Sequence, residues 1–258
     1  MNYICKQIRC IIASPAWWVG AGVSFAAMFQ GMLGDGFRDG MSVAYQLVTS
    51  MDVGTFIPLA PMAAILSVSH YLSNAMQRSW RSMSLPRTGK MRFVMDVSIS
   101  AALAGGAALA FGWLLAVLAA VMFGGAPLIG GNMLGLEESV IGGLLLTEKT
   151  AWIYYGLRLL LVFLYGQFCV FCAVPVAMLC AKAEMICLVP FVVLRVAQFF
   201  LLQRVLPFLS PTSILLGRDM GGSSVLTTIL LCVAGIMFWS TLLTMISEAL
   251  FQRSSCND

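Results

Sequence analysis

Residues 97–123, VSISAALAGGAALAFGWLLAVLAAVMF, decide the fold class of this chain, because they contain no charged side chain. The charge-free run continues as far as Leu136. A helix that crosses the hydrocarbon core of a bilayer needs about 20 consecutive, mostly apolar residues. The stretch therefore predicts a membrane-spanning helix at about 95–123.

Other parts of the chain repeat this pattern. Asp, Glu, Lys and Arg are also absent from residues 10–34, 53–77, 159–181 and 220–247. A further apolar stretch, 185–206, is interrupted by Arg195 and Arg204. We expect six membrane-spanning helices, at about 16–34, 53–74, 95–123, 152–180, 185–206 and 225–247. The predicted fold is an all-α integral membrane protein, with one transmembrane domain over residues 1–258 and no soluble domain.

The composition of the whole chain agrees with a membrane protein. Of its 258 residues, 60% are hydrophobic and 10% are charged, whereas soluble domains carry about 25% charged residues. The mean hydropathy is +0.92. Such a chain cannot cover a water-soluble globule with polar side chains. The composition therefore excludes soluble enzymes, disordered proteins and nucleic-acid-binding proteins, despite a net charge of +4.

The basic residues predict the orientation in the membrane, because Lys and Arg collect in cytoplasmic loops. With a cytoplasmic N-terminus and six spans, nine basic residues lie on the cytoplasmic side and four on the outer side. The cytoplasmic nine are Lys6, Arg9, Arg78, Arg81, Arg87, Lys90, Arg92, Lys182 and Arg253. The outer four are Arg38, Lys149, Arg204 and Arg218. We therefore expect both termini in the cytoplasm.

The first residues predict a short helix before the first span. Ile4, Ile8, Ile11 and Ile12 share one helical face within residues 2–13, a pattern typical of a helix lying in the membrane interface. A frayed tail is an equally open interpretation. Ser14-Pro15 suits the N-cap and first turn of the next helix. We interpret Trp17 and Trp18 as residues of the interfacial aromatic belt.

Polar residues inside the predicted spans are candidate functional sites, because they are costly in lipid. The candidates for a translocation pathway, or for a clamp between helices, are Arg158, Gln167, Arg195 and Gln198. Arg158 has a simpler interpretation, in which the side chain snorkels to the interface. Ala102, Gly106 and Ala110 form a stripe of small residues that predicts close helix packing.

Enzymatic and metal-binding interpretations are weak. His70 is the only histidine, and there is no phosphate-binding loop with Lys-Ser or Lys-Thr. Cys169 and Cys172 have the spacing of a metal-binding pair, but they lie in an apolar helix, where cysteine behaves as a small hydrophobic residue. We therefore expect no catalytic residue, metal or cofactor on this chain.

Residues 74–92, NAMQRSWRSMSLPRTGKMR, form the densest basic cluster and contain no acidic residue. A short amphipathic helix followed by Pro86 fits this stretch. Two interpretations remain open: a basic loop that meets anionic lipid headgroups, or a docking helix for a cytoplasmic partner.

This segment carries a resemblance to a known family. Three features resemble permease subunits of type-2 ABC exporters. They are a short basic start, Ser14-Pro15, and a "short helix, SLPRTGK, helix" segment that contains Leu85, Pro86, Arg87 and Lys90. The second half of the chain is similar in architecture, with a tight turn at 182–184. The resemblance spans nearly the whole chain, but its motifs are degenerate. It implies a re-entrant outer turn at about 207–211, between the last two spans.

The resemblance also implies partners. Such permeases form homodimers or heterodimers, and each sits on a separate ATPase subunit that binds ATP and Mg. It implies that 76–84 is the main coupling helix and 181–185 a smaller contact. The coupling residues would be Arg78, Trp80, Arg81, Met83, Arg87, Lys90, Lys182 and Glu184.

The function that the resemblance implies is export across a bacterial plasma membrane. The substrate would be hydrophobic or amphipathic: a peptide antibiotic, a lantibiotic, a drug or a lipid-like molecule, with resistance to an antibiotic or bacteriocin as the outcome. The alternatives are an exporter of polysaccharide or lipid-linked glycan, and a six-helix membrane scaffold that transports nothing.

Overall fold

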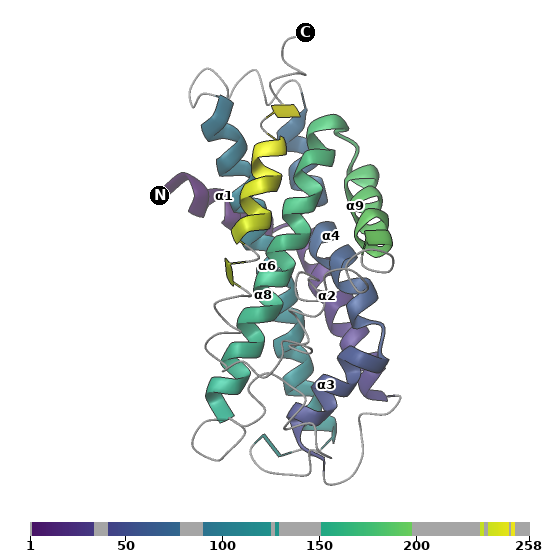
Figure 1. Cartoon of the computed structure of the whole chain (residues 1–258). Coiled ribbons are helices and arrows are strands. Elements are labelled where there is room, and N and C mark those ends of the chain that lie inside the picture. Colours follow the sequence, from purple (N-terminus) through teal and green to yellow (C-terminus); the bar gives the residue numbers. More distant parts are fainter. Residues whose placement is uncertain are drawn as a thin grey trace.

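The computed structural model describes a bundle of helices (Figure 1). The residues it describes are 2–33, 41–77, 90–124, 127–128, 151–197, 233–234, 237–247 and 249–250. The labelled helices are α1 (Asn2–Ile12), α2 (Pro15–Gly31), α3 (Val43–Val53), α4 (Phe56–Met76), α6 (Lys90–Gly124), α8 (Ala151–Leu179) and α9 (Ala183–Ala197). A shorter apolar helix covers Met237–Ser247.

Three of these helices are long and apolar enough to cross a membrane. They are α4, α8 and the part of α6 between Arg92 and Phe123. The pair α1 and α2 adds a fourth span if it is counted as one broken helix, whose two parts are bent by 66°. The helical, membrane-protein character expected from the sequence is therefore confirmed, with three to four apolar helices that could span a bilayer.

The last two predicted spans are described only in part. Helix α9 covers residues 185–197 of the span predicted at 185–206 and ends at Ala197. Of the span predicted at 225–247, the helix Met237–Ser247 is the main described piece. The re-entrant turn predicted at 207–211 lies outside the described residues.

One helix was not expected. The region between the first two predicted spans, 35–52, was interpreted as an outer loop, yet ten of its residues belong to the 11-residue helix α3. The Ser42 side chain caps this helix by accepting a hydrogen bond from the Tyr45 amide at 3.1 Å. The loop interpretation was wrong because charge gaps detect only segments that are long enough to span a membrane.

The start of α2 follows the prediction made from Ser14-Pro15. The Ser14 hydroxyl accepts a hydrogen bond from the Trp17 amide at 3.4 Å, and Pro15 occupies the first turn. Residues 2–12 form the expected short helix, α1, and Gln7 fastens it to α6. The Ser100 hydroxyl donates to the Gln7 side-chain oxygen at 2.7 Å, in a buried position. Helix α1 is therefore part of the bundle, not a frayed tail.

Glycines set the closest helix contacts. A Cβ on Gly106 of α6 would lie 2.6 Å from the Phe163 carbonyl oxygen of α8, and one on Gly166 would lie 2.8 Å from the Gly106 Cα. A Cβ on Gly20 of α2 would lie 2.6 Å from the Ala63 carbonyl oxygen of α4. Because only glycine permits such approaches, these positions bring the backbones of α6 and α8, and of α2 and α4, into contact.

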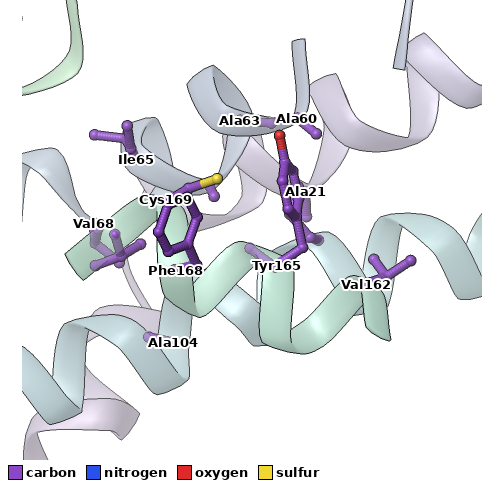
Figure 2. Packing of buried hydrophobic residues seen from close by; sticks show 14 of the residues in the cluster. Ala21, Ala60, Ala63, Ile65, Val68, Ala104, Val162, Tyr165, Phe168 and Cys169 are labelled. Atoms are coloured by element: carbon purple, nitrogen blue, oxygen red, sulfur yellow. The ribbon is translucent and has the colours of Figure 1, made fainter. Parts of the chain in front are cut away.

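Helix α4 occupies the middle of the bundle, where it packs against α2, α6, α8 and α9. Its Ala63, Ala64 and Ile65 are fully buried. Figure 2 shows Tyr165 of α8 directed at the turn of α4 that carries Ala60 and Ala63. Small side chains on α4 thus make room for an aromatic side chain from α8, as interdigitating cores require.

Candidate functional site

One end of the bundle brings the last turn of α4 beside the turn between α8 and α9. At this end the Ser73 hydroxyl of α4 donates a hydrogen bond to the carbonyl of Ala181, in the turn between α8 and α9. Lys182 of the same turn and Glu184 of the first turn of α9 are exposed. Helix α4 ends at Met76 and α6 begins at Lys90, so both of these helix ends lie within the basic cluster of residues 74–92.

Most of the predicted coupling residues cannot be placed further. Arg78, Trp80, Arg81, Met83 and Arg87 lie outside the described residues. Lys90 begins α6, but its side chain is not among those described. What the structure does bring together is the last turn of α4 and the α8–α9 turn, which are about 100 residues apart in the chain.

The opposite end of the bundle is built from α3, the start of α8 and the residues after α6. The Val43 amide donates to the Pro127 carbonyl at 3.1 Å, and the Tyr155 hydroxyl donates to the Leu128 carbonyl at 2.9 Å. The end of α2 meets the start of α4 here, since the Thr55 hydroxyl donates to the Gln30 side-chain oxygen at 2.6 Å. Successive long helices therefore run in alternate directions between two ends.

Arg158 lies near this second end and does not snorkel. Its side chain is only 3% exposed, and its guanidinium carbon lies 5.4 Å from the centre of the Tyr154 ring. Tyr154 is four residues earlier on the same face of α8, so the ring faces the cation and stabilises it. The snorkelling interpretation was wrong because this face of α8 is turned into the bundle.

Gln167 lines a cavity of about 210 Å³ between α6, α8 and the region of the short helix Met237–Ser247. Ala102 lies in the same wall, and Val233, Met237 and Ser240 supply the wall on the C-terminal side. Most of the lining is aliphatic or aromatic. The cavity thus offers an apolar space with the carboxamide of Gln167 and the hydroxyl group of Ser240.

Two of the pathway candidates, Arg158 and Gln167, do not share one site. Arg158 and Gln167 are nine residues apart on α8, which places them about 14 Å apart along the axis and on opposite sides of the helix. Arg195 lies in the last turn of α9 and is half-buried. Gln198 lies outside the described residues.

The three small residues of the predicted stripe on α6 each lie in a different environment. Gly106 contacts Phe163 and Gln167 of α8, and Ala102 lines the Gln167 cavity. Ala110 lines a separate, larger groove on the other side of the α6–α8 contact. Of the three, Gly106 lies at a close contact with the backbone of α8.

Buried polar groups appear that the sequence did not single out. Gln46 of α3 is fully buried, and within the described part of the chain neither polar atom of its carboxamide has a hydrogen-bond partner. Within the same described part, the indole nitrogen of Trp113 of α6 is also buried without a hydrogen-bond partner. Gln46 lay in the presumed outer loop, so its type and position gave no signal of burial.

No metal centre or nucleophilic cluster emerges from the described ranges. Within them, no group of three or more His, Cys, Asp or Glu side chains could hold a metal ion. Cys169 is buried and Cys172 half-buried, each as a free thiol. His70 is exposed on α4. Comparison with known proteins adds nothing to this, since no family model, curated protein or solved structure matches the chain.

Proposed function

We propose that this protein is the membrane-spanning permease subunit of an ATP-driven exporter, which works with a separate ATPase subunit and a second permease subunit. The observation that carries the proposal is the hydrogen bond between Ser73 and the Ala181 carbonyl. It fastens the end of α4, which leads into the basic segment, to the α8–α9 turn with Lys182 and Glu184. The last turn of α4 and the α8–α9 turn thus lie side by side, as a single ATPase-binding surface would require.

Helix α4 is suited to pass a displacement from that surface into the bundle. It continues directly into the basic segment and packs against α2, α6, α8 and α9. Its buried side chains are packed closely against these helices, because protein interiors contain few voids. An ATPase that moves the end of α4 would therefore shift the helices around it together.

The cavity beside Gln167 supports the substrate class. Its aliphatic and aromatic lining suits the apolar part of a hydrophobic or amphipathic molecule, and the Gln167 carboxamide can bind one polar group. A glycan would need many more hydrogen-bonding groups than this lining supplies. We therefore favour a peptide antibiotic, a drug or a lipid-like molecule over a polysaccharide, and propose export across a bacterial plasma membrane in the orientation with both termini in the cytoplasm.

Charge reversal at the proposed surface tests this function. Arg78→Glu with Arg81→Glu, and separately Lys182→Glu, should abolish association with the ATPase or leave ATP hydrolysis without transport. Lys149→Glu is the matched control, because it reverses a basic residue predicted at the other side of the membrane. Helical content and elution profile should remain those of the unmodified protein in all variants. Unchanged association and transport in the variants at the proposed surface would favour the non-transporting scaffold.

A further inference from the structure

An apolar groove of about 590 Å³ lies between α1, α2, α6 and α8, apart from the Gln167 cavity. Ile12 and Trp17 line one end of it, Ala107, Ala110 and Phe111 line one wall, and residues 156–163 contribute the opposite wall. Its volume falls within the range of about 300–1,000 Å³ that is usual for sites that bind small molecules.

The lining leaves no side-chain group for a polar ligand. Among the described residues that line the groove, only Trp17 carries a polar side-chain group, and its indole N–H already donates to the Ala104 carbonyl at 2.9 Å. Gly156 keeps one wall open, because a Cβ there would meet nothing within 4 Å. An open groove whose described lining is apolar fits a hydrocarbon chain.

Charge is concentrated where α1 reaches the groove. Helix α1 is bent by 66° from α2, and Ile12 in its last turn lines the groove. Arg9 and Lys6, about one and two turns before Ile12, are exposed, and residues 2–12 contain no acidic residue. Helix α1 therefore carries two positive charges, Lys6 and Arg9, and no negative charge.

We propose that this groove is a binding site for one anionic phospholipid, whose acyl chain lies against Ala110 and Gly156 and whose phosphate is bound by Lys6 and Arg9. Buried methylene groups supply the affinity, and the basic residues near the surface supply the preference for an anionic headgroup. The proposal depends on the membrane setting alone and holds whether or not the chain transports anything.

The test is native mass spectrometry of the purified full chain in detergent. Phosphatidylglycerol and phosphatidylcholine with identical acyl chains are titrated separately. One phosphatidylglycerol should bind about thirtyfold more tightly than phosphatidylcholine, as expected from two basic residues near the surface. Equal affinity for the two lipids would overturn the proposal.

Two kinds of variant separate the acyl chain from the headgroup. Gly156→Leu and, as an independent variant, Ala110→Leu should each weaken binding of both lipids about tenfold by filling the groove. Gly22→Leu is the matched control, because Gly22 of α2 lies off the groove and its Cβ also meets nothing within 4 Å. Wild-type binding by both groove variants, with circular dichroism confirming their helices, would overturn the site.

The headgroup variant is Lys6→Gln with Arg9→Gln. It should bind the two lipids with equal affinity, at the level that wild type shows for phosphatidylcholine. Lys182→Gln is its control, since Lys182 is exposed on the α8–α9 turn and not on α1. A headgroup preference that survives loss of Lys6 and Arg9, or that disappears in the Lys182 control, would contradict the assignment.

Discussion

Adjacent tryptophans show how strongly the surroundings differ at the scale of single residues. Trp17 is 4% exposed and donates its indole N–H to the Ala104 carbonyl of α6, whereas Trp18 is 54% exposed. Successive side chains on a helix point about 100° apart, so one ring enters the bundle and the other leaves it. The interfacial-belt interpretation is wrong for Trp17, which is a core residue.

Replacing each tryptophan by phenylalanine measures this difference. Trp17→Phe should lower the free energy of unfolding by about 1 kcal/mol, because it removes a buried hydrogen bond while keeping an aromatic ring. Trp18→Phe should change it by less than about 0.5 kcal/mol. Reversible unfolding in mixed micelles provides the comparison, and equal effects of the two replacements would contradict the placement of Trp17.

Arg158 shows how far the neighbours and the burial of a single residue can be predicted from the sequence. Tyr154 could be named as its neighbour because a spacing of four residues fixes a shared helical face. Whether that face meets lipid or protein could not be named, because α8 is apolar on every side and shows no polar face that would indicate its outer surface. Helix α6 is likewise apolar on every side, so the burial of Trp113 could not be predicted either.

At the scale of elements, α6 and α8 depend on their glycine contact. Gly106→Val should destabilise the bundle by about 1–3 kcal/mol, the usual cost of overpacking, because its Cβ would collide with the Phe163 carbonyl oxygen. Gly22→Val is the control, since it makes the same chemical change at an open position of a helix. The midpoint of thermal unfolding in detergent should fall for Gly106→Val and stay constant for Gly22→Val; a fall of equal size in both would attribute the effect to the residue type.

The long elements could be predicted from charge gaps, and the short one could not. Helices α4, α6 and α8 begin and end within a few residues of the predicted bounds, because a span must be both long and apolar. Helix α3 is short, and the stretch before it carries Asp35, Arg38 and Asp39. Its cap at Ser42 was a signal in the sequence, but serine is common in loops as well.

The candidate site was predictable only in part, again for a physical reason. Position in the chain indicated that the end of α4 and the α8–α9 turn share one side. The hydrogen bond from Ser73 to Ala181 and the two cavities beside α8 arise from tertiary packing, which one sequence does not encode in its spacing. Gln167 could be named as polar within a span, but not as a residue that lines a cavity.

At the scale of the whole molecule, the alternating helices predict which residues share a side of the membrane. Cys5 and Cys10 on α1 are exposed, and Lys182 is exposed on the α8–α9 turn. In sealed vesicles, an impermeant maleimide should reach Cys5, Cys10 and a cysteine placed at position 182 from one side. A cysteine at position 127 should react from the opposite side. Labelling of positions 127 and 182 from the same side would contradict the alternation.

The most direct measurement of the proposed function is the composition of the native complex after gentle extraction. The account predicts that this chain copurifies in fixed stoichiometry with an ATPase subunit that carries a phosphate-binding loop, and with a second permease subunit. It also predicts that Arg78→Glu with Arg81→Glu releases the ATPase and leaves the permease folded. A native complex that contains no ATPase would contradict the account.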